Sequence, residues 1–224
     1  MEKCGIRLVP KGFGAYLGTL NRPLSDARLT SPAASRNKEP ILEVLRRVLP
    51  ETGLVLEIAS GTGEHVAFLA MQLPRLSWQP SDPDPGARAS IAAWSAHAGN
   101  PENLRAPLDL DAAGEDWPIA AADAIVCINM IHISPWASCR GLMRGAARVL
   151  PHGGMLYLYG PYRAGGRHTA LSNDAFDRSL RAQDPSWGVR DIEDVIAEAE
   201  KNGLSFVETV AMPANNLSVL FRKF

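Results

Sequence analysis

The sequence has little of several features that mark specialised classes of protein. Its three cysteines, Cys4, Cys127 and Cys139, are widely spaced and form no C-x-x-C pair, so neither a disulfide framework nor a zinc site is indicated. No apolar run approaches the roughly 18 residues that span a membrane, and the N-terminus has no signal-peptide hydrophobic region. A formal net charge of -1 provides no general attraction to nucleic acid or to an anionic membrane. We therefore expect a cytoplasmic protein that binds neither.

The rest of the composition is that of an ordinary globular protein. The 224 residues are 46% hydrophobic and 21% charged, which is enough apolar material for one substantial core. Residues 1–30 carry scattered glycines without periodicity and are expected to form a loosely ordered extension. Residues 31–224 are expected to form a single domain, which begins with an amphipathic helix that follows Ser31-Pro32 and ends before Pro50.

Short apolar runs alternate with helical stretches through the rest of the chain. We predict helices at 64–72, 86–98, 137–149, 174–183 and 191–202. We predict strands at 54–59, 76–79, 104–107, 123–128, 154–159, 205–211 and 217–222. This order predicts a Rossmann-like, doubly wound α/β fold with a seven-stranded, mostly parallel sheet. The last strand is expected to be antiparallel, because only the short segment 212–216 connects it to the strand before.

An acidic residue, Glu57, interrupts the first apolar strand, and a turn containing Gly61 and Gly63 follows it directly. A glycine-rich turn between a strand and a helix lets a ligand touch the backbone and exposes the N–H groups at the start of the helix. Dinucleotides and S-adenosylmethionine are both bound in this way, and a glycine turn without a ligand is the simpler alternative.

The dinucleotide alternative is weakened by two departures from its patterns. Val66 occupies the place of the third glycine of G-x-G-x-x-G, and Tyr159 is followed at the Y-x-x-x-K spacing by Arg163 instead of lysine. The pattern acid-x-x-x-Gly-x-Gly at 57–63 instead resembles the first motif of class I S-adenosylmethionine-dependent methyltransferases. In that resemblance the carboxylate orients the ammonium group of the cofactor's amino-acid end.

Further matches follow at the ends of later strands. Asp82, 19 residues after the second glycine, suits a ribose diol, although Asp84 competes for this role and a Ser-Asp-Pro turn is an alternative. By resemblance, Asp109 would accept the adenine amino group and Leu110 would meet the ring through its backbone N–H. Asn129 lies at the end of the strand 123–128, where ligands bind in open α/β sheets, and a turn cap is its alternative role.

Longer sequence motifs narrow the resemblance to a particular family of methyltransferase-like proteins. These motifs are SPAASRNKEPIL (31–42), ASGTGEH (59–65), WQPSD (78–82), NMIHISPW (129–136), YGPY (159–162) and MPANN (212–216). Over about residues 25–224 the chain resembles a little-studied family of methyltransferase-like proteins, a domain of unknown function. The resemblance implies the fold and the cofactor but brings no established substrate. It adds to the expected cofactor site the residues Arg36, Ala59, Ser60, Thr62 and His65. Arg36 would pair with the cofactor's carboxylate, and an ordinary surface arginine is its alternative role.

Two residues are predicted to act in catalysis, His132 and Tyr162. His132 follows the strand that forms the crevice and has an ordinary pKa range suited to proton removal, but a hydrogen bond to the neighbouring loop would equally explain it. The residues predicted to bind substrate are Trp136, Tyr159, Arg163, Asn215 and Asn216. Each has an alternative role, in the core for the two aromatic residues, in a solvated loop for the arginine and in a turn for the two asparagines. No metal site is expected.

The predicted activity is in-line transfer of a methyl group from S-adenosylmethionine to a small molecule, with S-adenosylhomocysteine as the product. The lack of a separate recognition domain or a basic face favours a small acceptor over nucleic acid, and a protein acceptor stays open. Two other classes of protein remain as alternatives. These are a non-catalytic protein that binds the cofactor or serves as a scaffold, and, less favoured, an NAD(P)-dependent oxidoreductase.

Overall fold

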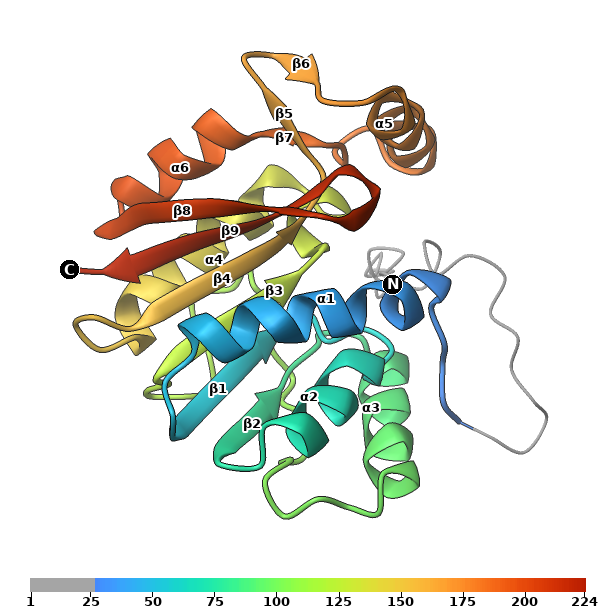
Figure 1. Ribbon diagram of the computed structural model, residues 1–224, viewed down its shortest axis with the longest axis vertical. Helices are drawn as coiled ribbons and strands as arrows, with labels where there is room; N and C mark the ends of the chain where they lie inside the picture. Colours follow the sequence, from blue (N-terminus) through green and yellow to red (C-terminus); the bar gives the residue numbers. More distant parts are fainter. Residues whose placement is uncertain (1–26) are drawn as a thin grey trace, which may run out of the picture.

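The computed structural model describes residues 27–224, and strands and helices alternate along most of this range (Figure 1). The helices are α1 (Pro32–Val48), α2 (Glu64–Gln72), α3 (Pro85–His97), α4 (Trp136–Val149), α5 (Leu171–Gln183) and α6 (Ile192–Glu200). The strands are β1 (Gly53–Ile58), β2 (Leu76–Pro80), β3 (Ala124–Ile128), β4 (Met155–Gly160), β5 (Tyr162–Ala164), β6 (Arg167–His168), β7 (Arg190–Asp191), β8 (Leu204–Met212) and β9 (Asn216–Lys223). Two short 3-10 helices are η2 (Met130–His132) and η3 (Pro213–Asn215).

The main sheet has six strands in the order β2-β1-β3-β4-β9-β8. The first four strands in this order pair in parallel, and β9 runs antiparallel to both β4 and β8. This arrangement confirms the predicted α/β fold, with its mostly parallel sheet and antiparallel last strand. A second sheet, β6-β5-β7, which the sequence pattern did not predict, lies beyond the end of β4.

The prediction of a strand at 104–107 was wrong, so the main sheet has six strands and not seven. This segment makes only two isolated parallel bridges, from Leu104 to Trp78 and from Leu108 to Ser81. Pro107 lies between the bridges and has no N–H to donate to a strand ladder. The side chain of Gln79 fills the gap by donating a hydrogen bond to the carbonyl oxygen of Ala106 at 2.7 Å.

Helices cover both faces of the sheet. One apolar cluster joins α1, α2 and α3 to the sheet, and a second cluster joins α4 and α6 to the opposite face. In Figure 1, α1 crosses in front of the sheet and α4 lies behind it. Side chains along β1 alternate between the two faces, so Leu56 and Ile58 pack in the α4 layer while Val55 packs in the α1 layer. Glu57 therefore points toward the side of α1.

Residues 27–30 are the part of the expected N-terminal extension that the structure describes. The expected loosely ordered extension falls, up to residue 26, outside the described residues. The backbone of Leu29 is already held against α3, because its N–H donates to Ser90 Oγ at 2.7 Å and its carbonyl oxygen accepts from Trp94 Nε1 at 2.8 Å. Within residues 27–224, no helix combines the length and apolar character needed to cross a membrane.

The connections place a crevice at the ends of β1 and β3. From β1 the chain passes to β2 on one side, and β3 then pairs with β1 on the other side. At such a reversal of strand order the loops diverge and leave a crevice outside the carboxyl ends of the strands.

Candidate functional site

A cavity of about 270 Å³ occupies this crevice, between the turn after β1, the end of β3 and the first turns of α1. We call it the first cavity. Its lining residues are Ser31, Pro32, Ala33, Ala34, Arg36, Glu57, Ala59, Ser60, Gly61, Thr62, His65, Ile128, Asn129 and Ile133. Most of the residues predicted to bind the cofactor therefore lie around one space.

Glu57 is the unusual charge in the first cavity. Only 2% of the residue is exposed, and its Oε2 atom is buried without a hydrogen-bond partner. Burial raises the pKa of Glu57 from 4.5 to about 8, although a hydrogen bond with Ser60 opposes the rise. A buried carboxyl oxygen without a partner is costly, so this position favours a ligand that supplies a hydrogen-bond donor, above all a cationic one.

Glycine is required at the two positions of the turn for different physical reasons. Gly61 has a φ of +57°, lines the cavity and would leave an added Cβ in nearly open space. Gly63 has a φ of +86° and does not line the cavity, and a Cβ there would lie 2.6 Å from the Cα of Ile91 in α3. In this structure Gly63 permits the close packing of the start of α2 against α3, and its contact with a ligand stays a prediction.

Asp82 supports the turn from behind. It is fully buried, its Oδ2 accepts from the N–H of Gly61 at 3.0 Å, and its Oδ1 accepts from the N–H of Asp84 at 2.9 Å. It does not line the first cavity. Its rival Asp84 caps α3, where its side chain accepts from the N–H groups of Gly86 and Ala87. In this structure Asp82 fixes the conformation of the glycine turn, so the predicted ribose contact would need its carboxylate to become accessible.

The residues predicted to hold the adenine ring do not reach the cavity. The side chain of Asp109 is 72% exposed and pairs with Arg88 at 3.1 Å. Leu110 is buried in the cluster that contains α4. Neither residue lines the first cavity. Because residues 104–108 leave the sheet edge after two bridges, the position of the following segment could not be derived from strand spacing.

A second cavity of about 500 Å³ adjoins the first. Its lining residues are Ala33, Arg36, Asn37, Asn129, Tyr159, Pro161, Ser172, Asn173, Phe176, Ala214, Asn215 and Asn216. Ala33, Arg36 and Asn129 line both cavities. Three of the predicted substrate-binding residues, Tyr159, Asn215 and Asn216, are in this wall, and the predicted cofactor residues Arg36 and Asn129 lie where the two spaces meet.

Backbone conformation is strained around both cavities. Five non-glycine residues among those described have a positive φ, and Ala59, Asn129, Ala214 and Asn215 of these line the cavities. Such conformations cost free energy, and they persist where the surrounding structure enforces them, often at functional sites. Asn129 is held by a 2.8 Å hydrogen bond from its N–H to the carbonyl oxygen of Tyr159.

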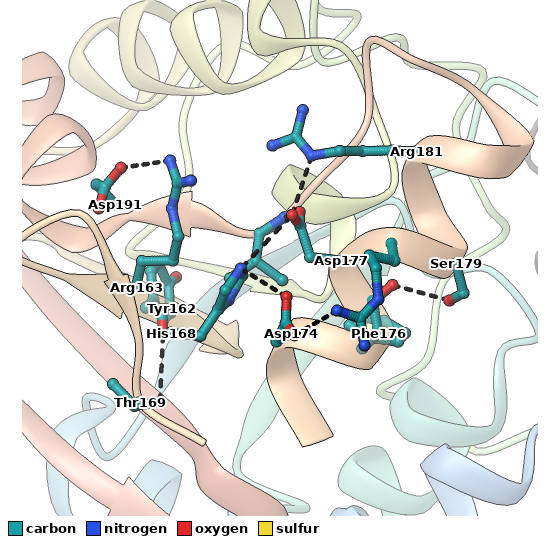
Figure 2. A network of polar contacts seen from close by, with 12 residues as sticks. Tyr162, Arg163, His168, Thr169, Asp174, Phe176, Asp177, Ser179, Arg181 and Asp191 are labelled. Carbon is teal, nitrogen blue, oxygen red and sulfur yellow. Dashed lines mark hydrogen bonds and ion pairs between the residues drawn. The ribbon is translucent and has the colours of Figure 1, made fainter. Parts of the chain in front are cut away.

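Helix α5 forms one wall of the second cavity and is fastened on two sides. The Nδ2 atom of Asn173 donates to Thr169 Oγ1 at 3.1 Å and to the carbonyl oxygen of Asn215 at 3.0 Å. Figure 2 shows His168 of β6 facing Asp174 and Asp177 of α5, with Nε2 at 3.7 and 3.6 Å from their carboxylate oxygens. The small sheet and the β8–β9 turn thus place Ser172, Asn173 and Phe176 at the cavity.

His132 and Tyr162 do not have the positions expected of catalytic residues. Both are buried, neither lines a cavity, and their rings meet edge to face at a centroid distance of 5.0 Å. The backbone of Gly160, at the end of β4, packs directly against His132, since a Cβ on Gly160 would collide with His132 Nε2. Burial, helped by Arg190, lowers the pKa of His132 to about 3, and burial raises the pKa of Tyr162 well above its usual range. The expectation that His132 is a general base near pH 7 is not supported by its place in the fold.

Two of the predicted substrate residues also lie elsewhere. Arg163 forms an ion pair with Asp191 of β7, as Figure 2 shows. Trp136 packs against the α4 cluster, and the guanidinium carbon of Arg190 lies 5.8 Å from the centre of its ring. Both belong to the support of the small sheet and not to the lining of either cavity.

Several residues of the second cavity were not predicted from the sequence as site residues. Asn37 is buried and its Oδ1 lies 2.7 Å from Nε2 of His65, which links the two cavity walls. Burial, with Lys38 nearby, lowers the pKa of His65 to about 4, so this ring is neutral. Asn173 is 4% exposed. The signal that the sequence offered for this residue was an asparagine within an amphipathic helix. Among residues 27–224, no three His, Cys, Asp or Glu side chains gather as a metal site would require.

Solved structures of methyltransferases share the fold. An O-methyltransferase family protein from Burkholderia thailandensis matches with a TM-score of 0.73 at 16% identity, over 85% of this chain and 57% of its own. An O-methyltransferase family 2 protein from Planctomyces limnophilus, solved with apigenin, matches with a TM-score of 0.71 at 18% identity, over 86% of this chain and 60% of its own. Human N-acetylserotonin methyltransferase, solved with S-adenosylmethionine, matches with a TM-score of 0.71 at 16% identity, over 85% of this chain and 52% of its own. The chain thus spans little more than half the length of these proteins, and the likeness shows the fold.

The sequence itself matches one family model along almost the whole described region. The match covers residues 28–223, from just before α1 to the end of β9. The model is described as a protein of unknown function, DUF938. With this coverage, the chain belongs to the DUF938 family, whose class I methyltransferase-like fold it has.

Proposed function

We propose that this protein binds S-adenosylmethionine in the first cavity and methylates a small molecule held in the second. The observation that carries the proposal is the buried, unpartnered Oε2 atom of Glu57 beside a glycine turn, in a cavity that shares three lining residues with a second one. The methyltransferase neighbours, one of them solved with S-adenosylmethionine, support the same assignment through the fold.

The residues present fit the amino-acid end of this cofactor. Glu57 would accept the ammonium group. The first turn of α1, with Ala33 and Ala34 in the lining, has no acidic residue, and the first N–H groups of a helix have no partner within it. This helix start would therefore receive the carboxylate. Gly61 would let the ligand approach the backbone closely.

When bound, the cofactor supplies an electrophilic methyl group on a sulfonium. The chain's own contribution is alignment, since residues at the junction of the two cavities can hold an acceptor in line with that group and keep water out. Asn129 is suited to this role because its backbone is fixed in a strained conformation and its side chain lies at the junction. No proton transfer is assigned to His132, which is buried behind Gly160.

Calorimetry with S-adenosylhomocysteine tests the binding step. We expect the wild type to bind it and Glu57→Gln to bind it at least about tenfold more weakly, because a charge-assisted hydrogen bond is lost. Glu51→Gln is the matched control, since its side chain is 84% exposed and distant from the lining. Absence of binding to the wild type, or equal binding by Glu57→Gln, would contradict the proposal.

A non-catalytic role in binding the cofactor is the second candidate function. It is favoured by one observation: the two residues predicted to act in catalysis, His132 and Tyr162, reach neither cavity. Transfer of a labelled methyl group to a metabolite extract separates the two functions. Labelled product supports the transferase, and tight cofactor binding with no product supports the non-catalytic role.

A further inference from the structure

The second cavity has a simple pattern of charge. Among its lining residues within 27–224, Arg36 carries the only formal charge, and neither Asp nor Glu is present. Arg36 extends from the exposed side of the first turns of α1. Its charge also reaches Tyr159, whose pKa is raised by burial while Arg36 opposes the rise. An anion in this cavity would therefore meet a cation and no competing carboxylate.

The cofactor's own carboxylate does not require Arg36. The start of α1 faces the first cavity through Ser31, Pro32, Ala33 and Ala34, and its free N–H groups already suit an anion. Arg36 lies one turn further along the helix and also lines the second cavity. The guanidinium group is thus available to a molecule on the acceptor side, where it can bind a carboxylate or a phosphate through two parallel hydrogen bonds.

The remaining walls of the second cavity combine amide groups with a larger apolar surface. They contain the amides Asn37, Asn129, Asn173, Asn215 and Asn216, together with the rings of Tyr159 and Phe176. The Nδ2 atom of Asn173 is engaged by Thr169 and the Asn215 backbone, so its carbonyl oxygen is the group left for a ligand. Such walls offer hydrogen bonds at a few positions beside apolar surface, which suits a small molecule that carries both polar groups and an apolar part.

We propose that the methyl acceptor is a small molecule with an oxyanion group and an apolar part, and that Arg36 binds the oxyanion in the second cavity. The inference rests on the proposed function, because it concerns the acceptor of the same reaction. Arg36 is here a substrate-binding residue and not, as the sequence pattern suggested, a residue for the cofactor.

The first experiment identifies the charge of the acceptor before its structure is known. A protein-free metabolite extract from cells of the source organism is separated on an anion-exchange resin into a retained and an unretained pool. Each pool is then incubated with the wild-type protein and S-adenosylmethionine labelled in the methyl group. We expect labelled product from the retained pool. Phosphatase treatment of that pool then distinguishes the two oxyanions, since a carboxylate acceptor survives it and a phosphate acceptor does not.

Product from the unretained pool alone would overturn the inference and leave the proposed function standing. Product from neither pool, with S-adenosylhomocysteine binding intact in calorimetry, would overturn the transferase proposal and the inference with it. The two failures are therefore distinguishable.

The second experiment assigns the role to Arg36. We expect Arg36→Gln to raise the acceptor's KM by about tenfold or more, and Arg36→Lys to raise it less, because the charge is kept without the planar fork. The dissociation constant of S-adenosylhomocysteine should stay within about twofold in both variants. Arg46→Gln, on the same helix but outside both cavities, is the control. Equal weakening of S-adenosylhomocysteine by Arg36→Gln would instead return Arg36 to the cofactor site and refute the inference.

Discussion

Replacing Glu57 with glutamine is expected to stabilise the fold at neutral and alkaline pH while it weakens ligand binding. Burial raises the pKa of Glu57 from 4.5 to about 8, so the folded state holds a proton that the unfolded state releases. The contribution to stability is fully present below pH 4.5 and is lost as the pH rises toward 8. Glutamine resembles the protonated carboxyl group and cannot ionise, so the variant escapes this loss.

The size of the effect follows from the pKa difference. Each pH unit between the two pKa values removes about 1.4 kcal/mol from the free energy of unfolding. At pH 7 the wild type has therefore lost roughly 3 kcal/mol relative to pH 4.5 at this one residue. For a domain of this size, that difference corresponds to roughly 6–12 °C in melting temperature.

Denaturant unfolding of wild type, Glu57→Gln and the exposed control Glu51→Gln at about pH 5, 7 and 9 measures the effect. The advantage of Glu57→Gln over wild type should be small at the lowest pH, grow with pH and level off above about pH 8, while the control stays within about 0.5 kcal/mol of wild type. The reasoning is refuted if Glu57→Gln is no more stable than wild type at pH 9, or if its advantage does not vary with pH.

Three further predictions follow from the same structure. Binding of S-adenosylhomocysteine near pH 7 should release protons in the wild type and not in Glu57→Gln, because an ammonium partner favours the ionised carboxylate. Calorimetry in buffers of different ionisation enthalpy measures the number of protons released. Equal proton release by the two proteins would contradict the prediction. Gly63→Ala should lower the free energy of unfolding by about 3 kcal/mol or more, because the new Cβ would collide with Ile91. Gly61→Ala should lower it by only about 1–2 kcal/mol and should mainly weaken ligand binding. Similar losses for the two variants in denaturant unfolding would argue against separate roles. His132→Phe should make the free energy of unfolding less sensitive to acid below pH 6.5, because the lowered pKa of His132 destabilises the folded state there. The variant should leave the pH dependence of the methyl-transfer rate unchanged. Loss of a pH-dependent change in that rate would instead identify His132 as a base.

The predicted features that the structure bears out depend on neighbours in the sequence. The apolar run before Glu57, the turn at Gly61 and the helix that follows occupy adjacent segments, so strand alternation and glycine conformation were enough to place them around one crevice. Asn129 was found in the same way, because it directly follows β3 and the ends of parallel strands meet at one edge.

The expected positions that differ from the structure depend on packing between distant segments. Asp109 follows a segment whose strand pairing is broken at Pro107, so its distance from the crevice could not be read from spacing. His132 lies only three residues after Asn129, yet η2 turns its ring into the protein interior behind Gly160. Whether a polar side chain faces a cavity or the core is decided by the elements that pack over it.

The sequence by itself determined the order along the chain of the six main-sheet strands and of the helices between them, the parallel pairing, and the glycine turn with its acid, because these depend on periodicity and on backbone geometry over a few residues. The tertiary structure alone decided that Gly63 serves packing against Ile91 and that Asp82 holds the turn. It also decided that α5 and the β8–β9 turn meet α1 around a second cavity, with Arg36 at its junction with the first. Those contacts join residues far apart in the chain, and their geometry follows from how whole elements pack and not from any local pattern.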